Sequence, residues 1–294
     1  QMKYILSLIF ISISFNQVFS TYDYLGSRAT AMSGAVTSGN HIESGIFHNP
    51  AQLSNHSGST IISGYSNLYD LDFLPLTHIG FSVKSYAINF EKISIEYNGN
   101  TLSSETTFGI AKGFNLYRDR QSLIQMGFRF NMYNYEFGKS AGTEGDGSNG
   151  INLGSGFASG ADIGFQGVLN NKYFIGYYLQ NITSYIEGSN LGANLPKTIS
   201  IGLSYAPYKD LITSLDINQL SGKTDSEIRF GIEYKLMKSF TIRTGLQSNP
   251  NRFSGGFDIG NIRLVNSYNS SFSYSFLTHH VLSTTHQFSV LVNF

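Results

Sequence analysis

The chain has 294 residues with no cysteine, and its 19 basic residues balance its 19 acidic residues. The lack of cysteine excludes disulfides, thiol catalysis and thiolate metal sites, and the neutral balance gives no basic footprint for nucleic acid. Only 13% of the residues are charged, against a usual share of about 25%, which suits a secreted β protein or a protein whose strands present alternate residues to lipid.

Residues 2–20 have the layout of a secretory signal peptide. Lys3 supplies the positive charge, and residues 4–15 form a mostly apolar run of twelve residues. Val18 and Ser20 stand three and one residues before a cut ahead of Thr21. This run is too short to span a membrane as a helix, and no later apolar run reaches about 18 residues. We therefore expect residues 1–20 to be removed on export; a buried amino-terminal helix is the alternative.

Residues 21–57 precede the first strand-like segment and differ from it in composition. They are rich in Gly, Ala and Ser and lack a clear period of two. Pro50 fixes its own φ and disfavours helix at Asn49, so this dipeptide predicts a turn. We expect this segment to fold apart from the strands that follow.

From residue 59 onward, apolar and polar residues alternate with the period of a strand, as in IRFGIEYKL at 228–236. The fourteen segments lie near 59–69, 76–84, 86–98, 103–115, 121–137, 157–169, 172–183, 197–206, 210–218, 226–236, 239–247, 251–258, 261–276 and 284–294. Many approach the ~9–11 residues of a membrane-spanning strand, whereas soluble strands average ~5–6. The even number favours a bacterial barrel. We predict an all-β fold, a transmembrane antiparallel β-barrel over 58–294, with a soluble β-sandwich as the alternative.

Several details of this barrel can be predicted from the pattern. A change of apolar parity within 86–98 and within 121–137 predicts a bulge or bend in each. Tyrosines near segment ends, including Tyr133, Tyr135 and Tyr208, are expected in the aromatic girdles at the membrane surfaces. A barrel of this size has a lumen too wide for strand side chains to fill. Residues 21–57 therefore predict a short N-terminal hatch that plugs the lumen.

Charged residues on the polar positions of the strands are expected to face the lumen: Arg129, Arg229, Glu233, Lys235 and Arg243. A basic residue facing lipid would cost ~2–4 kcal/mol near the midplane. We expect these residues to pair with one another or with the hatch. Within the hatch, Arg28 is expected to pair with one of three barrel carboxylates: Asp162, Asp216 or Glu233.

The chain ends in an amphipathic stretch that stops on an aromatic residue. Its apolar face is formed by Phe288, Val290, Val292 and Phe294. Such an ending is typical of the signal that outer-membrane barrels present to their insertion machinery. We therefore expect the outer membrane of a Gram-negative-type bacterium as the location, with its lipid and the barrel-insertion machinery as partners.

Nothing in the sequence predicts catalysis. The seven histidines are not arranged with a nucleophile and an orienting group. His279 and His280 are adjacent and would point to opposite faces of a strand. His48 is expected to pack or to hydrogen-bond within the hatch. We predict no enzyme activity, no cofactor and no metal.

A family resemblance rests on the N-terminal residues Arg28, Met32, Gly34, Asn49, Pro50 and Ala51. In this order they resemble the hatch of the FadL/PorV superfamily of outer-membrane barrels, and the chain is similar to its compact PorV- or PorQ-like members. Ser33 and Gln52 stand where that family commonly has Gly. The resemblance implies a fourteen-strand barrel with an N-terminal hatch.

The resemblance also implies two activities. PorV-like members act with the type IX secretion machinery to hold or hand over exported proteins. FadL-like members are passive channels for long-chain fatty acids or other hydrophobic small molecules, which leave the lumen toward lipid. Because the chain and its loops are short, leaving little material for a deep ligand funnel, the sequence favours the PorV-like role. A FadL-like channel and a structural envelope protein are the alternatives.

Overall fold

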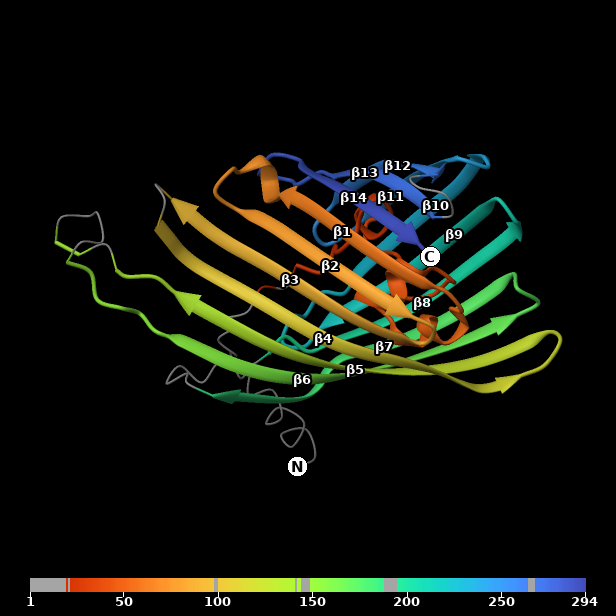
Figure 1. Cartoon of the computed structure of the whole chain (residues 1–294), viewed down its shortest axis with the longest axis horizontal. Helices are drawn as coiled ribbons and strands as arrows, with labels where there is room; N and C mark the ends of the chain where they lie inside the picture. The colour runs from red at the N-terminus through yellow and green to blue at the C-terminus, as the bar shows by residue number, and fades with distance from the viewer. Residues whose placement is uncertain are drawn as a thin grey trace, which may run out of the picture.

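The structure is a computed structural model that describes residues 20, 22–97, 100–140, 142–143, 149–187, 195–263 and 268–294. Its fourteen strands form one closed antiparallel barrel in which sequence neighbours pair and β1 closes the ring against β14 (Figure 1). The prediction of an all-β barrel with fourteen strands is confirmed. None of the described helices is both long and apolar enough to cross a membrane. The predicted signal peptide lies outside the described residues except for Ser20.

The strands are β1 (Ser59–Asn67), β2 (Pro75–Val83), β3 (Tyr86–Tyr97), β4 (Asn100–Arg118), β5 (Ser122–Phe137), β6 (Ser155–Leu169), β7 (Tyr173–Glu187), β8 (Thr198–Tyr208), β9 (Leu211–Leu220), β10 (Glu227–Met237), β11 (Phe240–Gln247), β12 (Arg252–Arg263), β13 (Asn269–Leu277) and β14 (Thr285–Asn293). The described helices are α1 (Ser27–Ala31), α2 (Ile42–Phe47), η2 (Pro50–Asn55) and η3 (Leu68–Asp70). β4 and β12 run further than the predicted segments 103–115 and 251–258. β13 begins later than the predicted 261–276.

Tight turns join the strands at one end of the barrel, and longer connections join most of them at the other (Figure 1). At the turn end, Asn170 and Asn171 have φ of 54° and 53°, which asparagine tolerates better than most residues. The carboxyl-terminal residue Phe294 also lies at this end, where its backbone N–H donates to the carbonyl of Ser59 at 2.9 Å. Short turns face the periplasm in bacterial barrels, so the loop end faces outward.

Side chains alternate strictly between the lumen and the outer face, as β6 illustrates with its pattern of buried and more exposed positions. Small or polar residues such as Gly164 and Gln166 face inward, whereas Phe157 is exposed outside. Neighbouring strands continue this apolar outer surface through Ile175 and Leu203. This surface is the band that contacts lipid in an outer-membrane barrel.

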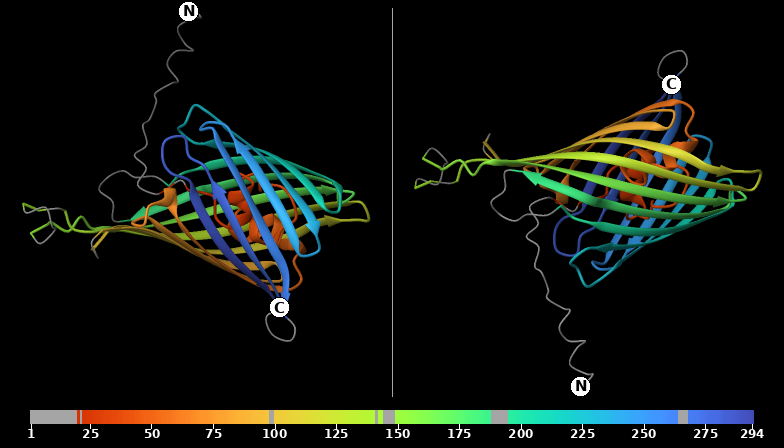
Figure 2. Two further views of the ribbon diagram at one scale, coloured as in Figure 1. Left: turned by 90° about the horizontal axis from the view of Figure 1, so that it is seen from above. Right: turned by 90° about the horizontal axis from the view of Figure 1, so that it is seen from below.

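The lumen is filled by residues 22–56, which we call the luminal segment (Figure 2). Its apolar side chains Ile46 and Leu53 are fully buried and belong to the same core cluster as Ile62 on β1 and Leu76 on β2. The largest hydrophobic core of the described chain therefore lies between the luminal segment and one wall of the barrel. The barrel proper begins at Ser59, two residues beyond the predicted boundary of the hatch.

Two details of the prediction need correction. The bulges expected within 86–98 and within 121–137 both lie on the facing strand β4 instead. Leu102 is the extra residue opposite Ile95 and Glu96, and Leu116 is the extra residue opposite Ile124 and Gln125. Tyr133 and Tyr135 were expected in an aromatic girdle, yet both are buried in the lumen. Odd-numbered residues of β5 face inward along the strand. The alternation of side chains therefore places both tyrosines in the lumen, although they lie near the end of the strand.

Candidate functional site

The luminal segment begins with a short helix whose ends depend on glycine. α1 follows Gly26, which has φ of 89°, and is followed by Ser33 and Gly34 with φ of 51° and 78°. A Cβ on Gly34 would also lie 2.4 Å from a guanidinium nitrogen of Arg229. Gly34 is therefore required both by its left-handed backbone and by the arginine packed against it.

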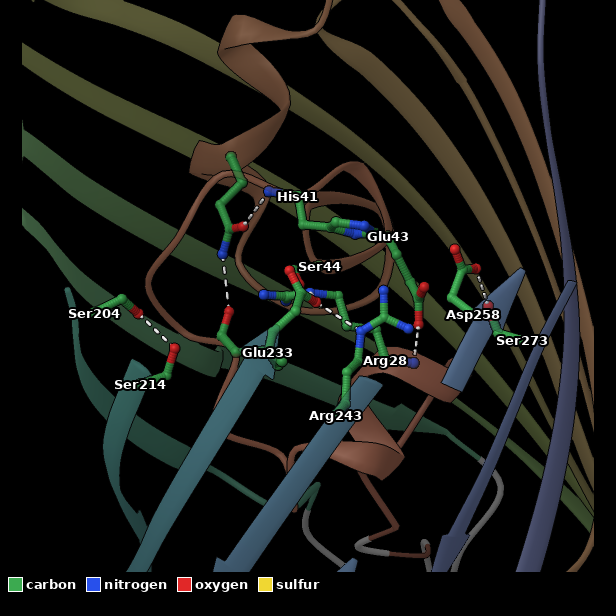
Figure 3. Close-up of polar contacts among 12 residues, drawn as sticks. Arg28, His41, Glu43, Ser44, Ser204, Ser214, Glu233, Arg243, Asp258 and Ser273 are labelled. Carbon is green, nitrogen blue, oxygen red and sulfur yellow. Dashed lines mark hydrogen bonds and ion pairs between the residues drawn. The ribbon is translucent and has the colours of Figure 1, made fainter. Parts of the chain in front are cut away.

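Arg28 on α1 joins the luminal segment to the barrel through a shared carboxylate. Its Nε donates to Glu233 Oε2 at 2.9 Å, and Arg243 Nε donates to the same oxygen at 2.6 Å (Figure 3). Arg28 Nη1 donates to the Ser44 hydroxyl at 2.9 Å. Of the three carboxylates considered from the sequence, Glu233 is the one in contact. Because the Arg28 side chain is 2% exposed and that of Glu233 is 14% exposed, this contact is largely shielded from water.

Glu43 on α2 completes this cluster. Its Oε1 accepts the backbone N–H of Arg28 at 3.0 Å. Burial raises the pKa of Glu43 to about 7, although the positive charges of Arg243 and Arg28 act in the opposite direction. The cluster thus contains one carboxylate held between two arginines and a second carboxyl group that protonates near neutral pH.

Arg229 makes a second connection, nearer the loop end. Its Nη1 donates to Asp23 Oδ2 at 2.8 Å and its Nη2 donates to Glu227 Oε2 at 2.7 Å. The guanidinium also lies 5.0 Å from the ring centroid of Tyr24. The start of the luminal segment is therefore held to β10 by a charge pair and a ring contact.

Arg129 on β5 holds the end of α2. Its Nη2 donates to the carbonyls of Gly45 and Ile46 at 3.0 and 2.6 Å, and its Nη1 donates to the carbonyl of Phe47 at 2.9 Å. The last carbonyls of a helix lack partners within the helix, and a cation is favoured there. Arg129 therefore acts as a cap supplied by the barrel wall. Lys235 instead is exposed near the turn end, where it lines a polar cavity of about 250 Å³.

The Asn49-Pro50-Ala51 motif forms the start of η2. Asn49 Oδ1 accepts the Ala51 N–H at 3.1 Å, and its Nδ2 donates to the Thr37 carbonyl at 2.8 Å. Asparagine is a good helix cap, and proline suits the first helical position. The motif packs on bare strand backbone, because a Cβ on Gly127 would lie 2.3 Å from Pro50 and one on Gly164 would lie 2.0 Å from Asn49.

Met32 is fully buried against the opposite wall. A Cβ on Gly231 would lie 2.8 Å from Met32 Cε, and one on Gly245 would lie 2.4 Å from its backbone. Ser33, which departs from the family pattern, places its hydroxyl 2.8 Å from that of Ser254 on β12. The second departure, Gln52, donates from Nε2 to the Val36 carbonyl at 2.9 Å. Both departures thus have polar contacts that glycine could not make.

A cavity of about 450 Å³ opens above the luminal segment at the loop end. We call it the outer vestibule; its lining includes Leu68, Leu74, Ile93, Glu105, Arg229 and Arg252. Glu105 and Arg252 are not among the site residues predicted from the sequence. Glu105 follows the polar parity of its segment and could have been found that way, whereas Arg252 begins its strand and carries no such signal.

The carboxyl-terminal strand presents its apolar residues outward. Phe288, Val290 and Phe294 are exposed on the outer face and Val292 is half-buried. The Phe294 ring lies 4.8 Å from that of Tyr268, centroid to centroid. The aromatic end of the chain is therefore placed on the outside of the barrel at the turn end.

The histidines show no metal arrangement in the part of the chain that the structure describes, where no group of three or more potential ligands is found. His48 Nε2 lies 3.0 Å from the Leu25 carbonyl. Burial lowers the pKa of His48 to about 4. This residue is therefore neutral at physiological pH and hydrogen-bonded within the luminal segment.

Comparison with known proteins identifies the fold. No protein-family model matches the sequence, and no curated protein matches it. Among solved structures, the chain is similar to the toluene transporter TodX of Pseudomonas putida, with a TM-score of 0.58, 11% identity and coverage of 95% of this chain and 99% of that one. A FadL homologue of Pseudomonas aeruginosa gives a TM-score of 0.53 at 10% identity, covering 96% and 99%. The chain is thus an outer-membrane β-barrel with the fold of the FadL-family channels.

Proposed function

We propose that this protein is a passive outer-membrane channel for hydrophobic small molecules, as the FadL-like interpretation of the sequence suggests. The observation that carries the proposal is the outer vestibule. It opens toward the loop end, has apolar side chains such as Leu68, Leu74 and Ile93 among its lining, and ends on the luminal segment. A small apolar solute can bury its surface there at ~25 cal/mol per Å².

The position of the luminal segment favours a narrow, selective route through the barrel rather than an open pore. Its buried contacts with both walls of the lumen leave cavities of about 450 Å³ above it and about 180 and 250 Å³ toward the turn end. A wide water-filled channel of the porin type would need that segment to be absent. TodX, which has the same fold, is described as a toluene transporter, and toluene is a hydrophobic small molecule of the class proposed here.

The test is uptake by a Gram-negative host that lacks its own hydrophobic-solute channels. Expression of this protein should raise the initial rate of labelled toluene or oleate entry. Ile93→Trp, which narrows the vestibule, should remove most of the gain. The matched control is Ile88→Trp on the same strand, because Ile88 is exposed on the outer face. Equal uptake with and without the protein would contradict the proposal.

A second candidate is the PorV-like role with the type IX secretion machinery, which the sequence favoured. The observation that favours it is the outer part of the barrel, where β4 to β7 are the longest strands and carry exposed apolar side chains at Leu102, Phe157 and Tyr185. Mild detergent extraction followed by mass spectrometry tests it. Recovery of exported proteins that is lost in a Leu102→Ser/Tyr185→Ser variant would support this role, and recovery of the barrel alone would count against it.

A further inference from the structure

The outer vestibule separates its unpaired charges onto opposite walls. Glu105 lies on β4 and Arg252 on β12, and both line the vestibule. In a closed ring of fourteen strands, the strand opposite β4 is β11, the neighbour of β12. A solute in the vestibule therefore meets a carboxylate on one side and a guanidinium on the other.

The acidic wall carries Glu105 on β4, and Glu91 on β3 lines the smaller cavity beside the vestibule. Neither takes part in an ion pair within the described ranges, where the salt bridges all involve other carboxylates. Glu105 accepts the backbone N–H of Ser20 at 2.8 Å, which shows that it can receive an N–H donor from the lumen. Asn89 adds a carbonyl oxygen that is buried without a hydrogen-bond partner and lines the small cavity beside the vestibule. The acidic side therefore presents hydrogen-bond acceptors to a bound solute.

Arg129 also lines that small cavity and is the cation nearest to the acidic wall among its lining residues. Both of its terminal nitrogens donate to the carbonyls at the end of α2, at 2.6 to 3.0 Å. One of these nitrogens also reaches the Tyr178 hydroxyl at 3.5 Å, while the Arg129 Nε is buried without a partner. Glu91 accepts from Asn89 Nδ2 at 2.9 Å. Among the described residues Glu105 makes no ion pair with Arg129, so its carboxylate stays available to a solute.

The basic wall has the opposite character. Arg252 has a buried Nε without a hydrogen-bond partner and makes no ion pair with any described residue. Gln247, its partner in the β11–β12 register, is 5% exposed and also has an Nε2 without a partner. Lys223 lines the same side. Three cations, Arg229, Arg252 and Lys223, stand on this side against the two carboxylates paired with Arg229, Asp23 and Glu227, so the wall keeps one net positive charge and free N–H donors.

We propose that the outer vestibule binds a dipolar chain molecule, with an ammonium group toward Glu105 and a carboxylate toward Arg252. The apolar part between the two charges lies against Leu74 and Ile93. Molecules of this class include ω-amino acids and short peptides. This inference rests on the proposed channel function, since it assigns the solute that enters at the vestibule. Charge-assisted hydrogen bonds at both ends give such a solute an advantage over one with a single charge.

The experiment compares four probes with the same eight-carbon chain: 8-aminooctanoate, octanoate, octylamine and octanol. Affinities are measured by titration calorimetry on the full chain in a non-ionic detergent. We expect 8-aminooctanoate to bind about tenfold more tightly than either singly charged probe. Glu105→Gln should remove its advantage over octanoate and Arg252→Gln its advantage over octylamine. Glu136→Gln, at an exposed glutamate of β5, is the matched control and should change neither ratio.

The outcomes separate this inference from the channel function. If all four probes bind alike and the host still takes up toluene or oleate, the dipolar assignment is wrong and the channel function stands. If no probe binds and uptake is also unchanged by the protein, both proposals fail. An advantage of 8-aminooctanoate that persists in both vestibule variants would place its site elsewhere and overturn the assignment.

Discussion

Glu233 is the residue whose replacement should most clearly release the luminal segment. Its Oε2 accepts from Arg28 of the segment at 2.9 Å and from Arg243 of the barrel at 2.6 Å. In Glu233→Gln, the neutral amide loses both charge pairs while keeping nearly the same volume. Two arginines then face each other in a space that is largely closed to water. We expect the segment to spend more time displaced from the lumen.

The size of the effect follows from burial. Removing one partner of a buried ion pair costs ~3–5 kcal/mol. The Glu233 side chain is 14% exposed, so we take the lower end, about 3 kcal/mol. Since ~1.4 kcal/mol is a factor of ten in an equilibrium constant, the displaced population should rise about a hundredfold. A lumen without its segment conducts ions.

Single-channel recording in planar bilayers measures that displaced population. The natural protein should be almost silent, and Glu233→Gln should show frequent openings. Glu136→Gln removes an exposed carboxylate from the outer part of β5 and should stay silent. A double-mutant cycle of Arg28→Met and Glu233→Met should show coupling of at least 1 kcal/mol, in the range of ~0.5–3 kcal/mol seen for contacting residues. Silent recordings for Glu233→Gln, with the variant correctly inserted, would show that this carboxylate does not hold the segment in the lumen.

Three further predictions concern the same segment. Ser33→Cys/Ser254→Cys, whose hydroxyls lie 2.8 Å apart, should cross-link the segment to β12 and stop uptake until a reductant is added; continued uptake by the cross-linked form would show that the segment need not move. Gly127→Val places a Cβ 2.3 Å from the segment's backbone and should destabilise the packing of the segment by ~1–3 kcal/mol. This loss should be seen as channel openings in planar bilayers. The control Gly260→Val, whose added Cβ has its nearest neighbour at 3.4 Å, should remain closed. Because burial raises the pKa of Glu43 to about 7, its stabilising effect is complete below its ordinary pKa and is lost as pH rises through about 7. Limited proteolysis of the segment should therefore accelerate from about pH 5 to about pH 8, and Glu43→Gln should flatten that profile; an unchanged profile in the variant would assign the pH response to another group.

The barrel could be predicted because lipid imposes a rule on every strand. One face must be apolar along the whole span, and the chain must return repeatedly to satisfy its backbone in a closed ring. The period of two therefore persists through segments such as 228–236, and each becomes a strand. Strand ends were less predictable. β4 continues beyond both ends of its predicted segment, and at the loop end its outer part stands beyond the band where lipid enforces the alternation.

The luminal contacts could be predicted only by class. That charges such as Arg229 would face inward follows from the cost of exposing them to lipid. The choice of the carboxylate that contacts Arg28 depends on the stagger of neighbouring strands and on the height of α1 within the lumen. The local sequence determines neither of these. Arg252 could not be singled out from the sequence for the same reason, because the role proposed for it depends on the position of β12 across the ring from β4.

The positions of the strand glycines explain how the luminal segment is held. Gly127 and Gly164 on one side and Gly231 and Gly245 on another leave room that the segment occupies within van der Waals distance. Side chains at these four sites would fill the lumen themselves and exclude the segment. The lumen is therefore shaped to this segment as a protein core is shaped to its side chains. Since close packing resists gradual deformation, a solute is expected to pass by a discrete shift of part of the segment, such as the stretch between Asp23 and α1 that floors the vestibule.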